Sequence, residues 1–340
     1  MTIADLFPPL AQSPSDVQTQ PFRPRALGLG AAGQVVDTSS EAATTFNGPH
    51  TDEARADEAL TNASLLYQQN QQWQQARTQA LVPSAADVER ALSKQRLDLN
   101  DLRALLSPAA ANYLEPMLAA ATHAKRRYQG NTLKLFAPVY LSNLCSNECS
   151  YCGFSRSNAV KRRQLTVGEA LREAEAVKQS GIHSLLLVTG EHARKAGAAY
   201  LAEVTAALRP QVAQLMLESQ PLSLDEYRWL RHCGIDGVML YQETYDVASY
   251  QRHHSFGKKA DMANRLQAPT RVLEAGIATL GMGVLLGLSD WRADVWCLAA
   301  HLSALKQQFY QASFSVALPR LQPCEGNLQQ HSGVTDRQYL

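Results

Sequence analysis

The sequence of 340 residues predicts an α/β fold, a TIM-type (β/α) barrel that is incomplete at its C-terminal end. Six apolar runs of strand length occur between residues 133 and 318, and segments with helix-capping residues separate them. Strands that alternate with helices at this spacing are typical of βαβ units and a parallel sheet. The runs are apolar almost throughout, as expected for parallel strands buried on both faces. They are 133–141, 184–188, 214–219, 237–241, 279–286 and 312–318.

Two regions precede the predicted barrel. Residues 1–60 are rich in Ser, Thr, Ala, Gln, Pro and Gly and show no sustained periodicity, which predicts a disordered extension. Residues 61–131 carry helix start signals, among them Ser84–Asp87, with an acid three residues after the cap, and the pair Ser107–Pro108. We therefore expect a helical N-terminal segment over 61–131 and the barrel domain over 132–340.

Helix caps mark the segments between the runs. Thr166–Glu169 and Ser223–Glu226 are predicted capping boxes. Pro269 is expected to start the helix before the fifth run, since proline favours the first helical position. A complete eight-stranded barrel needs two further strands. We therefore expect the barrel to stay open after its sixth strand, as in a chain shortened at its C-terminus.

The composition favours a soluble, cytoplasmic protein. Lys and Arg total 32 and Asp and Glu total 31, so the charge balance gives no reason to expect nucleic acid or a membrane as a partner. Residues 1–9 lack the charged and apolar regions of a secretory signal. The longest apolar run, 279–288, is too short to span a membrane. The six cysteines do not resemble a disulfide scaffold, and clustered thiols need a reducing compartment.

Three of these cysteines lie within eight residues, directly after the first predicted strand. They are Cys145, Cys149 and Cys152, spaced C-x3-C-x2-C. Thiols this close converge in space, which indicates a metal or a cluster. A zinc site needs a fourth ligand, for which only the distant His183 or Cys324 are candidates. A cluster of four irons held by three thiolates instead leaves one iron open to another ligand, and a third interpretation is that the thiols are incidental.

Polar residues follow the ends of the other predicted strands. Active sites of parallel barrels collect at these ends, so we expect the side chains to face one site. In strand order they are Thr189, Gly190 and Glu191, then Glu218, then Tyr241 and Glu243, then Gly283 in the fifth strand, and finally Arg320.

Each of these residues also has a purely structural interpretation. Thr189–Glu191 can serve as a turn and cap, and Gly283 as a packing residue. Arg320 must find an anion, which is either a structural carboxylate such as Glu243 or a substrate carboxylate held by two parallel bonds. The run 253–259, with its paired His and paired Lys residues, is expected to lie at the surface.

Sequence blocks around these positions carry a resemblance to a known family. The blocks are Tyr140–Asn143, Tyr151–Phe154, Leu186–Glu191, Tyr241–Tyr245, Leu285–Arg292 and Leu318–Arg320. Together with the cysteine loop, they resemble the radical S-adenosylmethionine (SAM) superfamily and, within it, the 2-iminoacetate synthase family of tyrosine lyases. The resemblance runs from about residue 82 to the end of the chain.

The resemblance implies both cofactors and a reaction. Cys145, Cys149 and Cys152 would bind a 4Fe–4S cluster whose fourth iron is chelated by SAM. A 5′-deoxyadenosyl radical would then start the cleavage of the Cα–Cβ bond of L-tyrosine. The products would be 4-methylphenol and 2-iminoacetate, which supplies the thiazole moiety of thiamine. The residues implied for cofactor binding are Tyr151, Thr189, Gly190, Glu191 and Gly283, and those for catalysis are Arg320, Glu243 and Tyr241.

The resemblance also implies partners and leaves rival functions open. The partners would be a thiazole synthase that consumes the imine and an electron donor such as flavodoxin or ferredoxin. One rival is the tyrosine lyase of iron-only hydrogenase maturation, and a more distant one is a sulfur-insertion enzyme like biotin synthase. From a different class, a non-catalytic iron–sulfur protein is the alternative, although a simple carrier normally closes its cluster with a fourth cysteine.

Overall fold

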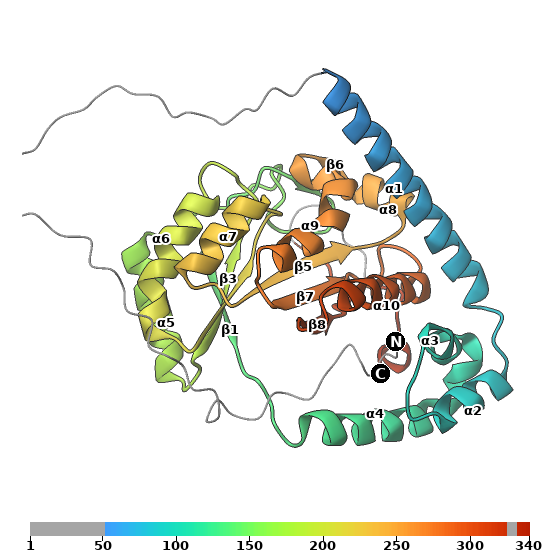
Figure 1. Ribbon diagram of the computed structural model, residues 1–340. Coiled ribbons are helices and arrows are strands. Elements are labelled where there is room, and N and C mark those ends of the chain that lie inside the picture. Colours follow the sequence, from blue (N-terminus) through green and yellow to red (C-terminus); the bar gives the residue numbers. More distant parts are fainter. Residues whose placement is uncertain (1–51, 325–331) are drawn as a thin grey trace, which may run out of the picture.

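The computed structural model of the protein describes residues 52–324 and 332–340. Its centre is a six-stranded sheet in the order β1-β3-β4-β5-β7-β8, in which every neighbouring pair is parallel (Figure 1). The strands are β1 Ala137–Ser142, β3 Ser184–Thr189, β4 Gln214–Glu218, β5 Gly237–Glu243, β7 Thr279–Val284 and β8 Ser313–Ala317. The predicted six parallel strands are confirmed, with β1 and β8 as the edges of this sheet.

Helices connect the strands and cover one face of the sheet (Figure 1). They are α5 Val167–Gln179, α6 Ala198–Leu208, α7 Leu224–Cys233, α8 Val247–His253, α9 Met262–Glu274 and α10 Trp291–Gln308, with α11 Asp336–Tyr339 near the end. Short 3-10 turns, η4 Arg209–Gln211 and η5 Lys258–Ala260, follow α6 and precede α9. The capping boxes predicted at Thr166 and Ser223 are both formed, and they begin α5 and α7.

The start of α9 differs from the prediction. Asp261 caps this helix by accepting a hydrogen bond from the backbone N–H of Asn264, and Pro269 lies inside the helix. The prediction that Pro269 starts the helix is therefore wrong. Burial of Met262 and Leu266 holds the first two turns against the core, and this tertiary contact outweighs the cost of an internal proline.

The N-terminal segment is helical. Its elements are α1 Asp52–Gln79, α2 Ala85–Ser93, α3 Leu99–Leu106, η3 Pro108–Tyr113 and α4 Leu114–Gln129. Helix α1 begins inside the stretch for which we expected disorder, because its last turns bury Trp73 and Ala76 against the main core. The rest of that stretch, residues 1–51, lies outside the described residues.

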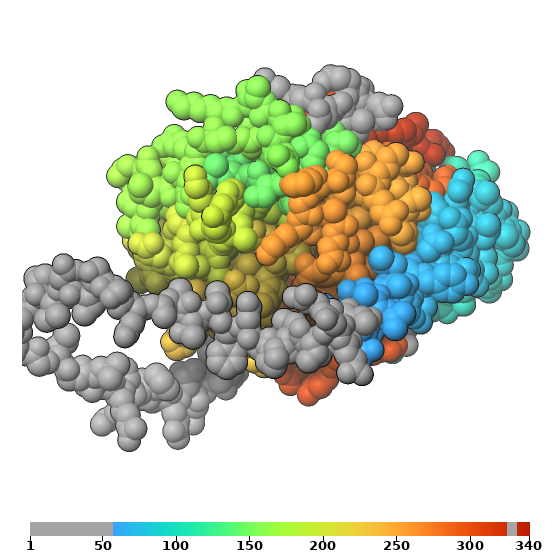
Figure 2. Space-filling view, turned by 90° about the horizontal axis from the view of Figure 1, so that it is seen from above, coloured from blue at the N-terminus to red at the C-terminus, as the bar shows by residue number. Residues whose placement is uncertain are grey.

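Helix α10 is the element on which the N-terminal helices dock. The indole Nε1 of Trp73 donates to Asp294 Oδ1 at 3.0 Å, and that of Trp296 donates to the carbonyl of Leu99 at 2.9 Å. Asp294 also accepts from Thr244 and from the backbone N–H of Tyr245, both just after β5. One buried carboxylate therefore ties α1 to the end of a barrel strand. From above, α1 (blue) lies beside the segment that holds α8 and α9 (orange; Figure 2).

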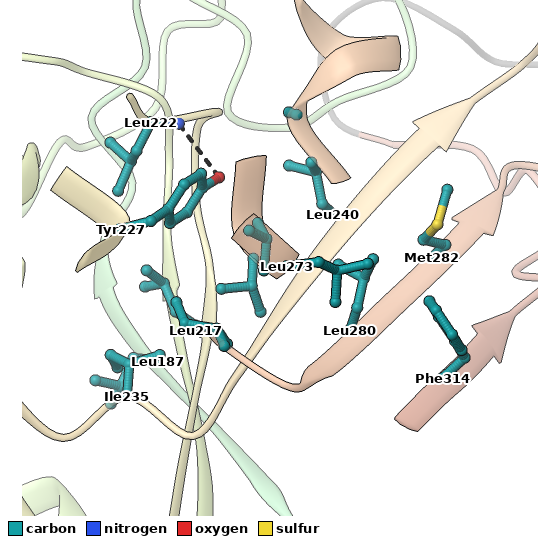
Figure 3. Close-up of a cluster of buried hydrophobic side chains, with 14 of the residues drawn as sticks. Leu187, Leu217, Leu222, Tyr227, Ile235, Leu240, Leu273, Leu280, Met282 and Phe314 are labelled. Atoms are coloured by element: carbon teal, nitrogen blue, oxygen red, sulfur yellow. Dashed lines mark hydrogen bonds between the residues drawn. The ribbon is translucent and has the colours of Figure 1, made fainter. Parts of the chain in front are cut away.

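The two faces of the sheet bury different sets of side chains, because residues alternate in direction along a strand. Leu187, Leu217 and Leu280 face the helices and belong to the main core, where the hydroxyl of Tyr227 accepts from the Leu222 N–H (Figure 3). The opposite, inner face forms a smaller cluster. It consists of Leu186, Val188, Met216 and Met239, with Tyr241 packed against them.

A second, two-stranded sheet was not predicted. β2 Glu148–Cys149 pairs antiparallel with β6 His254–Phe256, so the cysteine loop is fastened to the segment after α8. In the space-filling view the green and orange parts of the chain, to which these two segments belong, border each other (Figure 2). Among the residues that the structure describes, no helix is both long and apolar enough to cross a membrane.

Candidate active site

The three clustered cysteines lie in the wall of a cavity of about 410 Å³. The cavity is also lined by residues at the C-terminal ends of β3, β4 and β5, as the barrel architecture predicts. Cys149 is buried, whereas Cys145 and Cys152 are partly exposed, and all three are free thiols. The sequence prediction that polar strand ends meet the cysteine loop is confirmed for Thr189–Glu191, Glu218, Tyr241 and Glu243.

Arg162 holds the cysteine loop together, and the sequence reasoning missed it. Its Nη1 donates to the carbonyls of Asn143 at 2.8 Å and Phe154 at 2.9 Å. Its Nη2 donates to the carbonyls of Ser155 at 2.6 Å and Asn158 at 3.2 Å. These carbonyls lie on both sides of the C-x3-C-x2-C segment, so one planar guanidinium closes the loop on itself. No sequence motif marks this arginine, because its partners are backbone atoms.

Burial disfavours the thiolate form of two of the three clustered cysteines. Burial raises the pKa of Cys149 to about 12 and also raises the pKa of Cys152. A thiol in this environment is unreactive until a metal removes its proton. Within the described ranges, no three His, Cys, Asp or Glu side chains are grouped to hold one metal ion. A cluster, in which each thiolate binds a different iron, fits three separated thiols better than zinc does.

Gly190 lets the end of β3 approach the cysteine loop. A Cβ at this position would lie 2.4 Å from the carbonyl oxygen of Leu144 and 3.2 Å from the Cβ of Cys145. The N–H of Gly190 donates to the Ser142 carbonyl at 2.8 Å, which joins the ends of β1 and β3. The hydroxyl oxygen of Thr189 is buried beside it and has no hydrogen-bond partner in the described part of the chain.

Two ion pairs line the cavity. Arg265 Nη2 lies 2.7 Å from Glu191 Oε1, and Lys259 Nζ lies 2.7 Å from Glu243 Oε1. Asn147, between Cys145 and Cys149, connects them: its Nδ2 donates to Glu191 Oε2 and its Oδ1 accepts from the Lys259 N–H. Burial lowers the pKa of Lys259, but the negative charges led by Glu243 outweigh burial and raise it above its usual value.

The ion pair with Glu191 uses only one of the three guanidinium nitrogens of Arg265. The Nε and Nη1 atoms of this almost fully buried guanidinium have no hydrogen-bond partner among the described residues. Buried donors without partners are costly, so they fit a site that an anionic ligand group completes. A lone arginine in the first turn of a helix gave no sequence signal.

The run 253–259 is only partly at the surface: Ser255, Phe256 and Lys258 are exposed, as the sequence predicted, but two of its residues lie inside. His254 is buried and Lys259 lines the cavity, because β6 pairs with the cysteine strand β2 and carries this run inward. His254 Nδ1 lies 2.7 Å from the Tyr250 carbonyl, and its Nε2 lies 2.7 Å from the Tyr151 hydroxyl. A carbonyl can only accept, so Nδ1 carries the proton and Nε2 accepts from Tyr151. Burial lowers the pKa of His254 to about 3, which keeps the imidazole neutral.

Glu243 lies at the strained end of β5. Its φ of 71° is the one positive φ of a non-glycine residue among the residues that the structure describes. Strained backbone of this kind persists only where surrounding contacts hold it and is concentrated at functional sites. The bond from Leu285 N–H to the Glu243 carbonyl and the pair with Lys259 supply these contacts. Tyr241, two residues earlier, lines the cavity from the same strand.

Comparison with known proteins agrees with this geometry. The model of the radical SAM superfamily matches residues 139–295. The 2-iminoacetate synthase of Escherichia coli (strain K12) is 47% identical over 269 residues, which cover 79% of this chain and 71% of that protein. The same enzyme of Salmonella typhimurium is 46% identical over 270 residues, covering 79% and 72% of the two chains.

The chain belongs to the 2-iminoacetate synthase family of radical SAM enzymes. Among solved structures, the FeFe-hydrogenase maturase HydG from Carboxydothermus hydrogenoformans is 28% identical with a TM-score of 0.70, covering 85% of this chain and 67% of that one. The predicted superfamily, the lyase class and the fold class, a partial TIM-type barrel, are confirmed. The superfamily uses a 4Fe–4S cluster and SAM, so the predicted cofactors are confirmed as well.

Two residues expected at the family's site have other contacts in the structure. Arg320 Nη1 pairs with Asp336 of α11, its guanidinium lies over the Tyr339 ring, and it does not line the cavity. Gly283 does not line the cavity either. A Cβ there would lie 2.3 Å from the Ala317 carbonyl oxygen and 2.9 Å from the Tyr241 ring, so this glycine allows β7, β8 and Tyr241 to pack together.

Proposed function

We propose that the protein is a radical SAM lyase that cleaves the Cα–Cβ bond of L-tyrosine into 2-iminoacetate and 4-methylphenol. The observation that carries this proposal is the match to two 2-iminoacetate synthases over most of both chains. The 2-iminoacetate would supply the thiazole moiety of thiamine. The proposed setting is the cytoplasm, and the proposed protein partners are a thiazole synthase and an electron donor such as flavodoxin or ferredoxin.

The residues present fit the two cofactors. Cys145, Cys149 and Cys152 would hold the cluster, and SAM would lie in the same cavity, beside the end of β3 that Gly190 allows to approach the loop. When bound, the cluster and SAM supply a 5′-deoxyadenosyl radical, which removes a hydrogen atom from the substrate. Thr189, with its unpaired hydroxyl, would assist in holding the cofactor.

The protein's own contribution is positioning. The free Nε and Nη1 of Arg265 would hold a carboxylate of a bound amino-acid group, and Glu191 keeps this guanidinium in place. Tyr151 is fixed by His254 and shapes the wall between the cysteines. Tyr241 and Glu243 would orient the substrate from β5. These groups are rigidly held before a ligand arrives, which reduces the entropic cost of orienting the reactants.

Arg320 remains a candidate for binding the tyrosine carboxylate, although in the structure it pairs with Asp336. The Asp336 side chain is exposed to water, so this ion pair is weak and another carboxylate can replace Asp336. We propose that a substrate carboxylate replaces it.

The rival functions differ in what supports them. The HydG structures share the fold with 28% identity, well below the identity to the 2-iminoacetate synthases. The match to one HydG structure covers only 58% of the HydG chain. A non-catalytic iron–sulfur protein would have no use for a cavity with two buried ion pairs facing the cysteine loop.

The test is reconstitution under anaerobic conditions with iron, sulfide, SAM, a reductant and L-tyrosine. We expect release of 4-methylphenol together with 5′-deoxyadenosine. Release of 5′-deoxyadenosine without 4-methylphenol would support radical SAM chemistry but refute L-tyrosine as the substrate that is cleaved. Cys149→Ala should abolish the cluster absorbance, whereas the control Cys233→Ala, on α7 and away from the cavity, should retain it. An unchanged spectrum in Cys149→Ala would refute the ligand assignment.

A further inference from the structure

The charges around the cavity do not cancel. Among the described lining residues, Lys259 pairs with Glu243 and Arg265 pairs with Glu191. Glu218 also lines the cavity, but its carboxyl group has no salt-bridge or hydrogen-bond partner in the described part of the chain. Outside the cysteines, the cavity therefore carries one uncompensated carboxylate. An uncompensated charge in a partly buried site is costly, so a cationic ligand group would complete it.

Glu218 lies on the inner face of the sheet. It is the last residue of β4, paired in register with Val188 on β3 and Met239 on β5. Glu218 points to the same side of β4 as Met216, because the two are separated by one residue, and Met216 belongs to the inner cluster. The carboxyl group therefore rises from an apolar floor inside the barrel. Ion pairs formed over such a floor are stronger than in water.

The substrate offers the group that this site lacks. We propose that Glu218 binds the α-ammonium group of the amino-acid substrate. An ammonium has three N–H donors and a carboxylate accepts from several directions, so the pair forms charge-assisted hydrogen bonds. This inference rests on the proposed function, because it takes L-tyrosine as the amino acid. It adds a recognition residue that neither the cysteine motif nor the rest of the lining provides.

The protonation of Glu218 gives the proposal a signature in pH. Burial and, next, the charge of Glu243 raise the pKa of Glu218 to about 7, although Lys259 and Arg265 act in the opposite direction. Of the groups that face it, Glu243 and Tyr241 come from β5, Lys259 from η5 and Arg265 from α9. Glu218 accepts an ammonium only as a carboxylate. The affinity for tyrosine should therefore fall as pH drops through about 7.

The experiment compares the reconstituted holoenzyme with its Glu218→Gln variant, which keeps the size of the side chain. Titration calorimetry with SAM present measures the binding of L-tyrosine and of 3-(4-hydroxyphenyl)propionate, which lacks the amino group. We expect Glu218→Gln to weaken tyrosine binding by about 10- to 100-fold, the range for a charge-assisted hydrogen bond, and to leave the deamino analogue unchanged. The pH dependence near 7 should also disappear. The matched control is Glu203→Gln, on the exposed face of α6, which should change nothing.

Other outcomes would overturn the inference. An equal loss of affinity for tyrosine and for the deamino analogue would show that Glu218 does not contact the amino group. A loss of SAM affinity in Glu218→Gln would assign this carboxylate to the cofactor. A wild-type protein that binds tyrosine but releases no 4-methylphenol would refute the proposed reaction while the binding comparison still tests Glu218.

Discussion

Breaking the ion pair between Lys259 and Glu243 should be one of the more costly single changes to the apoprotein, because it leaves a buried charge without its partner. Each side chain is only 12% exposed, and the nitrogen and oxygen lie 2.7 Å apart. Lys259→Met removes the charge but keeps most of the aliphatic chain. It leaves the Glu243 carboxylate unpaired in the cavity, at a residue whose backbone is already strained. Removing one partner of a buried pair costs about 3–5 kcal/mol. We expect about 3 kcal/mol here, since both groups keep some contact with water.

A double-mutant cycle separates the pair from the two single effects. Glu243→Gln should also cost about 3 kcal/mol, because it leaves the Lys259 ammonium unpaired. The double variant, with neither charge, should lose less than the sum of the two losses, with a coupling energy of about 2 kcal/mol or more. The assay is urea unfolding of the apoprotein, followed by circular dichroism at constant pH and salt. A coupling energy below about 0.5 kcal/mol would refute the reasoning.

The matched control is an exposed ion pair of the same kind. Arg228 and Asp225 lie 3.0 Å apart on α7, with side chains 56% and 89% exposed. Arg228→Met should change the free energy of unfolding by no more than about 0.5 kcal/mol, since water screens exposed pairs. A large loss in this variant would mean that the change to Met, and not the loss of the buried pair, explains the result at Lys259.

Two further predictions concern Gly190, at the site, and His301, on α10. Gly190→Ala should destabilise the protein by about 1–3 kcal/mol and reduce iron incorporation, because the added Cβ meets the Leu144 carbonyl. In the control Gly153→Ala, the added Cβ meets nothing within 4 Å. Equal losses of stability and of bound iron in the two variants would contradict the prediction. Burial lowers the pKa of His301 from the usual 6.5 to about 4. Below pH 6.5 the unfolded state therefore binds more protons than the folded state, and the free energy of unfolding should fall by about 2 kcal/mol between pH 6.5 and pH 5. His301→Gln should reduce the fall of the unfolding free energy between pH 6.5 and pH 5, whereas His232→Gln, at an exposed position, should not. The same pH dependence in both variants would contradict the assignment of this fall to His301.

The sequence by itself determined the order of the elements and one end of the site. Apolar runs and capping boxes are local signals, so the six strands and the starts of α5 and α7 followed from neighbouring residues. The three cysteines were also readable, because their spacing keeps all three in one short loop of the cavity wall. The residues Thr189–Glu191, Tyr241 and Glu243 were placed correctly, since parallel strands bring their C-terminal ends to one edge.

Only the tertiary structure decided how the other end of the site is built. Arg265 and Lys259 reach the cavity, and His254 contacts Tyr151 in its wall, because β6 pairs with β2 and because α9 packs its first turns on the core. The pairing of β2 with β6 leaves no local pattern, since it joins segments about a hundred residues apart. The same holds for Glu218: its sequence position marks only a strand end. What makes it a candidate for binding substrate is that the neighbouring cations are already paired with other carboxylates.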